Sequence, residues 1–199
     1  MEYKEFFSAV AIALTFIAFL PYIRSIQQGK TKPHVFSWVI WGSTTFVVFL
    51  AQLADKGGVG AWPIGISGII TLYVAFLAYI KKSDNMITAM DWWFFLLAMS
   101  SLPLWYLTSD PLWAVVILTG VDILGFAPTF RKAYSHPFDE QLRFFVIMAV
   151  RNLTSIFALE HYSKTTVLFP VVIAAACIIF ILMVVYRRRI LSLKKSVEH

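Results

Sequence analysis

The most constraining feature of this sequence is a series of seven apolar stretches, each close to 20 residues long. A helix of about 20 apolar residues crosses a hydrocarbon core roughly 30 Å thick. Only 14% of the 199 residues are charged, whereas soluble domains carry about 25% charge. The sequence therefore predicts an all-α membrane protein with seven transmembrane helices. The stretches are Phe6–Ile23, Phe36–Leu53, Ala61–Ile80, Asp91–Leu107, Pro111–Phe130, Leu142–Leu159 and Thr166–Tyr186.

The chain also matches itself after a shift of 107 residues. Repeat-related pairs include Pro21 and Pro128, Arg24 and Arg131, Pro63 and Pro170, and Lys81-Lys82 and Arg188-Arg189. Internal duplication of membrane helices is a feature of transporters. Because one helix separates the two copies, both copies have the same orientation and are parallel repeats. The predicted organisation is a first three-helix repeat (1–82), a linker transmembrane helix (83–110) and a second three-helix repeat with a basic C-terminal tail (111–199).

The basic residues predict the orientation of the chain. With the N-terminus outside, 13 of the 17 Lys and Arg residues fall on the inner side, and Arg151 lies within a helix. The outer side then holds only Lys4, Lys56 and Lys164. The positive-inside rule therefore predicts an outer N-terminus and an inner C-terminus. The same distribution explains the net charge of +6, so no nucleic-acid partner is predicted.

Both repeats carry a proline just before a basic inner loop, within Phe19-Leu20-Pro21-Tyr22-Ile23-Arg24 and Phe126-Ala127-Pro128-Thr129-Phe130-Arg131. With the three-one-three arrangement, these segments make the chain resemble the SWEET and PQ-loop superfamily of transporters. The passage Lys30–Trp38 is similar to the family's entry into its second helix. In the Pro-Gln motif of that family, Tyr22 and Thr129 stand in place of the glutamine.

The W-x-x-W spacing of Trp38 and Trp41 also resembles the PnuC group of vitamin transporters. Both resemblances imply a facilitator or proton-linked carrier with a central cavity between the two three-helix units. The substrate they imply is a sugar or similar small polar metabolite, with a vitamin or nucleoside as the alternative. A receptor or sorting protein on the same helical frame, which binds without transport, is a further alternative.

Two charged residues are predicted near the middle of the membrane. Asp122 lies about 16 Å from the outer end of its helix and Arg151 about 14 Å from the inner end of the next. An unpaired charge at that depth costs from about 2.5 to over 10 kcal/mol. Two interpretations stay open: an ion pair that ties two helices together, or a pair that binds substrate or couples transport to protons.

Other polar and aromatic residues complete the predicted substrate site. Trp41 is a candidate for stacking, and Asn152 for a polar substrate contact or an interhelical hydrogen bond. Trp38 also suits an anchor at the membrane interface. The full set of substrate-binding candidates is Trp38, Trp41, Thr44, Thr45, Asp122, Arg151 and Asn152.

The repeated prolines predict hinges, because a proline inside a helix removes a backbone hydrogen bond and kinks the helix. The predicted hinge or gating set is Pro21, Pro63, Pro128 and Pro170. The sequence holds none of the common enzyme motifs, so no catalytic residue, cofactor or metal is predicted. The predicted partners are a small-molecule substrate, the lipid bilayer and, for a proton-linked carrier, protons. A homo-oligomer stays open, and the compact chain favours a bacterial plasma membrane.

Overall fold

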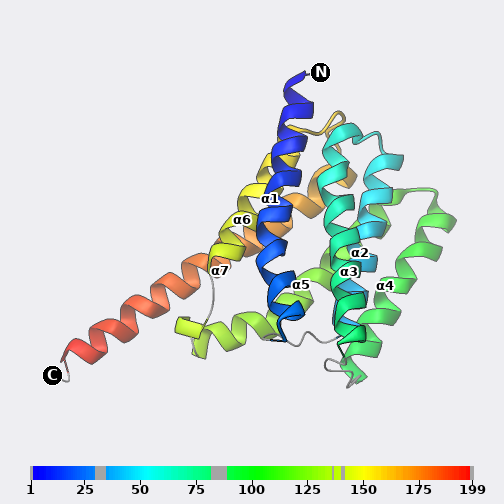
Figure 1. The fold of residues 1–199 in the computed structure, drawn as a ribbon. Coiled ribbons are helices and arrows are strands. Elements are labelled where there is room, and N and C mark those ends of the chain that lie inside the picture. The colour runs from blue at the N-terminus through cyan, green and yellow to red at the C-terminus, as the bar shows by residue number, and fades with distance from the viewer. Residues whose placement is uncertain (1, 30–34, 82–88, 136, 140–141, 198–199) are drawn as a thin grey trace.

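In a computed structural model, the described residues are 2–29, 35–81, 89–135, 137–139 and 142–197. They form seven α-helices and two short 3-10 helices, and no strand occurs among them (Figure 1). The predicted all-α class is confirmed. The elements are α1 (Glu2–Gln27), α2 (Val35–Ala54), η1 (Gly58–Ala61), α3 (Trp62–Ile80), α4 (Ala89–Thr108), α5 (Pro111–Ser135), η2 (Pro137–Asp139), α6 (Leu142–Phe157) and α7 (Lys164–Val197).

Four helical segments are long and apolar enough to cross a membrane: Tyr3–Gln27, Val35–Ala54, Gly58–Ile80 and Lys164–Leu193. These segments support an integral membrane protein. The described apolar parts of α4 and α5 are shorter, at Trp92–Thr108 and Pro111–Phe126.

The helices extend beyond several of the predicted apolar limits, because backbone hydrogen bonding continues where the side chains become polar. The largest difference is in α7, which continues past Tyr186 to Val197 and projects from the bundle (Figure 1). Arg187 in this extension donates from Nε to the carbonyl of Tyr134 at 3.0 Å, and its guanidinium lies 4.1 Å from the Tyr134 ring centroid. In the other direction, α6 ends at Phe157, two residues before the predicted limit at Leu159.

The arrangement of the helices follows a regular pattern of neighbours. Helix α3 contacts both α1 and α2, and α7 contacts both α5 and α6. Between these groups, α1 contacts α6 and α2 contacts α5, while α4 packs on α5 and α2. The predicted first and second repeats therefore meet mainly through α1 with α6 and α5 with α2, and α2 also contacts α7.

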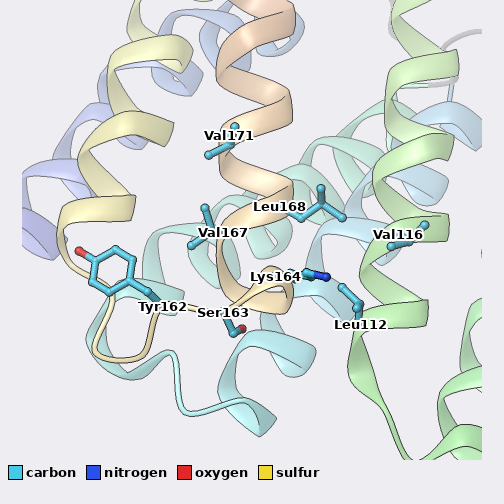
Figure 2. A pocket seen from close by; sticks show the side chains of 8 residues that line it. All are labelled: Leu112, Val116, Tyr162, Ser163, Lys164, Val167, Leu168 and Val171. Atoms are coloured by element: carbon cyan, nitrogen blue, oxygen red, sulfur yellow. The ribbon is translucent and has the colours of Figure 1, made fainter.

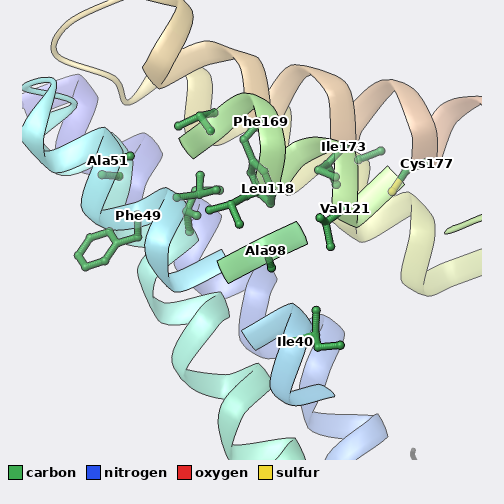
Figure 3. Packing of buried hydrophobic residues seen from close by; sticks show 14 residues of the cluster. Ile40, Phe49, Ala51, Ala98, Leu118, Val121, Phe169, Ile173 and Cys177 are labelled. Atoms are coloured by element: carbon green, nitrogen blue, oxygen red, sulfur yellow. The ribbon is translucent and has the colours of Figure 1, made fainter. Parts of the chain in front are cut away.

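The main hydrophobic core lies where α2, α5 and α7 meet (Figure 3). Val48 of α2 is 0% exposed, and Leu118 and Val121 of α5 are each 1% exposed. Ile173 and Cys177 of α7 close the cluster. This apolar packing surrounds the polar side chains that the sequence places at mid-helix.

Candidate functional site

Asp122 lies on α5 and faces α2. Its side chain is 8% exposed, and its Oδ1 accepts a hydrogen bond from the Thr44 hydroxyl at 3.0 Å. The same hydroxyl lies 2.9 Å from the Trp41 carbonyl oxygen, which also accepts from it. Thr44 has a single hydroxyl hydrogen to share between these two acceptors. The neighbouring Thr45 is also buried.

Arg151 lies on α6 and is 1% exposed. Its Nε donates to the Thr15 hydroxyl at 3.1 Å, its Nη2 to the Pro63 carbonyl at 2.6 Å and its Nη1 to Asn152 Oδ1 at 2.9 Å. Asn152 is fully buried, and its Nδ2 donates to the Met148 carbonyl at 2.8 Å. All three guanidinium nitrogens are therefore bound to groups of the protein itself.

These two networks are related by the 107-residue shift. Asp122 is the repeat equivalent of Thr15, and Arg151 is the equivalent of Thr44. The bond from Thr44 to Asp122 joins α2 to α5, and the bond from Arg151 to Thr15 joins α6 to α1. Both helix pairs thus meet at equivalent positions through a side-chain hydrogen bond.

Asp122 and Arg151 themselves form no ion pair among the residues that the structure describes, although they are the two charged side chains buried there. The two interpretations of the sequence treat them as one pair, and the geometry separates them. Asp122 belongs to the contact of α2 with α5, while Arg151 ties α6 to α1 and to the start of α3. Of the two, Arg151 has the surroundings of a structural residue.

Trp41 packs against α5 one helical turn from Asp122. A Cβ atom at Gly125 would lie 2.7 Å from Trp41 Nε1, so only glycine leaves room for the indole there. Gly125 follows Asp122 by three residues and lies on the same side of α5. The contact therefore places the aromatic ring of Trp41 from α2 beside α5, one turn away from the Asp122 carboxylate.

Trp38 belongs to an aromatic cluster rather than to the membrane interface alone. Its ring stacks on Tyr22 with centroids 5.0 Å apart and lies edge-on to Phe19 and to Trp41, at 6.5 and 5.8 Å. Phe19 also contacts Phe144 of α6 at 5.9 Å. The cluster packs α1, α2 and α6 together beside Trp41.

Pro170 lies inside α7, where it has no N–H to offer to the carbonyl of Thr166, four residues earlier. Gln52 of α2 supplies the missing donor, since its Nε2 lies 2.7 Å from the Thr166 oxygen. Gln52 is fully buried. The carbonyl that the proline frees is therefore the point at which α2 is tied to α7.

The 107-residue shift aligns Pro63 with Pro170, and a polar side chain of another helix is also bonded near Pro63. It lies in the first turn of α3, where a proline kinks no helix. The residue four positions earlier is Val59, whose carbonyl accepts from the Ser8 hydroxyl of α1 at 2.6 Å. The Val59 carbonyl also accepts from the Trp62 N–H, so unlike the Thr166 carbonyl it is not left without a backbone donor by the proline.

The remaining predicted hinge residues lie within long helices. Pro21 is exposed inside α1, which continues to Gln27. Pro128 lies in α5, but its side chain falls outside the described set, as do the loop residues 30–34 that carry part of the resemblance. The hinge role of the four prolines stays a prediction.

Two loops meet at the end of the bundle where α1 begins, namely residues 55–59 after α2 and 158–163 before α7. The Ser163 hydroxyl donates to an Asp55 carboxylate oxygen across this contact. The Glu160 N–H donates to the Gly57 carbonyl at 3.1 Å, within the same pair of loops. These bonds hold the end of the bundle closed, and we call them the end latch.

An open groove of about 750 Å³ lies beside the latch, between the first turns of α5 and α7 (Figure 2). Leu112 and Val116 of α5 line it together with Val167, Leu168 and Val171 of α7, and among the described residues its polar groups come from residues 162–164. This apolar lining suits a hydrocarbon chain better than a polar solute. None of the predicted substrate-binding residues lines the groove.

Sequence reasoning missed three of the residues that make these contacts, Thr15, Gln52 and Gly125. It predicted Pro63 as a hinge, but not the contact of the Pro63 carbonyl with Arg151. The repeat held a signal for Thr15, because that residue aligns with Asp122. Gly125 also had one, since it follows Asp122 by one helical turn. Comparison of the chain with protein-family models, curated proteins and solved structures finds no match.

Proposed function

We propose that this protein is a small-solute membrane carrier, either a facilitator or proton-linked, that works by alternating access between two parallel three-helix repeats joined by a linker helix. The proposed repeats are α1–α3 and α5–α7, with α4 as the linker. The substrate site lies between them at mid-membrane. A sugar or similar small polar metabolite is the substrate class that the sequence resemblance favours.

The observation that carries this proposal is the pair of repeat-related hydrogen bonds, Thr44 to Asp122 and Arg151 to Thr15. Each bond crosses from one proposed repeat to the other, and the 107-residue shift converts one into the other. A duplicated transporter is expected to have its substrate site at such an interface near the bilayer midplane. The equivalent neighbours of α3 and α7 support the same reading.

The proposed orientation is N-terminus out and C-terminus in, in a bacterial plasma membrane, as the basic residues favour. The end latch then lies on the outer side. A carrier with alternating access must break the contact between residues 55–59 and 158–163 during each cycle.

A disulfide lock tests the carrier proposal. Asp55→Cys and Ser163→Cys, combined with Cys177→Ala, place two thiols where the side chains already touch. We expect oxidation of this variant in sealed liposomes to stop the flux of a carried solute and reduction to restore it. The solutes are radiolabelled glucose, alanine and choline, and Cys177→Ala alone is the control.

The same experiment separates a carrier from a receptor. Saturable binding of a solute without flux into the liposomes would favour the receptor or sorting protein. Flux that persists unchanged in the oxidised variant would contradict alternating access through this end of the bundle.

A further inference from the structure

We propose that Asp122 and the Trp41 indole, which packs against Gly125 one turn further along α5, form the binding site for a small organic cation. This inference rests on the proposed function and narrows its substrate class from polar solutes in general to monovalent organic cations. It follows from the unequal bonding of the two buried charges and from the Trp41 indole, which packs against the same helix as Asp122.

Asp122 retains unused capacity to bind a ligand. Its Oδ1 accepts from Thr44, while its Oδ2 has no hydrogen-bond partner among the described residues. Among the described residues, Gln52 Oε1 is the side-chain nitrogen or oxygen that is fully enclosed and has no hydrogen-bond partner. Asp122 Oδ2 is therefore not completely covered by the described protein atoms, although the residue as a whole is only 8% exposed. A carboxylate oxygen in this position can accept a hydrogen bond from an incoming molecule or attract a positively charged group of it.

The protein does not itself neutralise this carboxylate within the described residues. Arg151, the other buried charge, is 1% exposed and directs its three nitrogens to Thr15, Asn152 and the Pro63 carbonyl. A substrate anion would have to displace one of these groups to reach Arg151. The site thus offers a negative group to a ligand and withholds its positive group.

Trp41 supplies the second recognition element. Its indole lies over Gly125, one turn or about 5 Å along α5 from Asp122. The residue as a whole is half-buried, so the described protein groups do not cover it completely. Indole faces attract cations within about 6 Å of the ring centroid, more strongly where water is excluded. A carboxylate beside an indole favours a cationic ligand over a neutral one of the same shape.

Matched pairs of probes test the inference on the unaltered protein in lipid nanodiscs. Choline is compared with its neutral isostere 3,3-dimethylbutan-1-ol, and benzylammonium with benzyl alcohol, by calorimetric titration. We expect the cation of each pair to bind about tenfold to a hundredfold more tightly. Choline adds an ionic attraction to the carboxylate and a cation–π contact with the indole, and benzylammonium also donates a hydrogen bond to a charged group. Equal or weaker binding of both cations would overturn the inference.

Variants place the preference at this site. Asp122→Asn keeps the shape of the side chain and should abolish the difference between cation and isostere. Asp110→Asn is the matched control, because Asp110 is exposed at the start of the same helix, where its Oδ1 caps the Leu112 N–H at 2.9 Å. Trp41→Leu should weaken cation binding more than isostere binding, which a purely structural tryptophan would not do. If Asp122→Asn still bound the cation more tightly than the isostere by the same factor, the assignment of the site to Asp122 would be overturned. If that variant does not fold, the comparison of cation and isostere on the wild-type protein decides whether a cation site exists.

Flux of radiolabelled choline into sealed liposomes separates this inference from the carrier proposal. Cation-selective binding without any flux supports the site and contradicts the carrier. Lock-sensitive flux of glucose with no cation preference supports the carrier and overturns the cation site.

Discussion

Arg151 on α6 donates from Nε to the Thr15 hydroxyl on α1 at 3.1 Å, across 136 residues of sequence. The 107-residue shift aligns this bond with the one from Thr44 to Asp122. In that second bond the charged residue is an anion on α5 instead of a cation on α6. The contacts of α6 with α1 and of α2 with α5 thus each include a polar side-chain bond, but the two bonds differ in chemistry.

Arg151→Lys is expected to destabilise the protein even though it keeps the charge. Lysine lacks the planar fork of donors, so at least one of Thr15, Asn152 and the Pro63 carbonyl loses its partner. We expect the free energy of unfolding to fall by about 1–3 kcal/mol. Thermal unfolding in detergent micelles measures the change. Arg143→Lys, at an exposed position of α6, is the control, and an equal effect of the two substitutions would contradict a structural role for Arg151.

Gly125→Ala is expected to disturb the contact with Trp41. The added methyl group would lie 2.7 Å from the indole nitrogen, and such overpacking costs about 1–3 kcal/mol. Gly120→Ala on the same helix meets no atom within 4 Å, so the higher helix propensity of alanine should leave stability unchanged or raise it by up to about 1 kcal/mol. Parallel melting curves compare the two variants. Similar curves would show that Trp41 is not held against α5.

Gln52→Leu is expected to lower the free energy of unfolding by about 1 kcal/mol, because the Thr166 carbonyl loses its donor. Pro170→Ala provides the test of the cause. Alanine restores a backbone N–H that can bond to that carbonyl, so Gln52→Leu should cost much less in the Pro170→Ala background. A double-mutant cycle of chemical unfolding measures this coupling. Additive effects of the two substitutions would refute the link.

The number of membrane crossings can be tested by labelling single cysteines in the Cys177→Ala background. Glu5→Cys and Arg189→Cys place thiols at exposed positions near the two ends of the chain. We expect an impermeant maleimide to label the first from outside intact cells and the second only after permeabilisation. Labelling of both from the same side would be incompatible with an odd number of crossings.

Several features of the candidate site were accessible from the sequence because they depend on composition and spacing. Asp122 and Arg151 stand out as charges in apolar helices, and the 107-residue shift aligns them with Thr15 and Thr44. The sequence could not show which of these four residues touch. An ion pair between the two charges was an equally reasonable reading, and the packing of α2 on α5 and α6 on α1 replaced it with two separate bonds.

The prolines illustrate the same limit. A repeated proline in an apolar helix predicts a missing backbone hydrogen bond, and this much follows from its chemistry. Whether the freed carbonyl becomes a hinge or an attachment point depends on what lies opposite. In the structure Gln52 lies opposite the freed Thr166 carbonyl and ties α2 to α7. The Val59 carbonyl, which Ser8 binds, already accepts from the Trp62 N–H, so the proline in the first turn of α3 frees no carbonyl there.

The sequence by itself determined that the chain is helical and apolar enough for a membrane, and that its two halves share a register. Helix formation and hydrophobicity are local properties, and a repeat is visible in the order of residues alone. Only the tertiary structure decided that Arg151 is enclosed by protein groups while Asp122 keeps a free oxygen beside Trp41. Those facts depend on which helix faces meet, and that choice is made by packing between residues far apart in the chain.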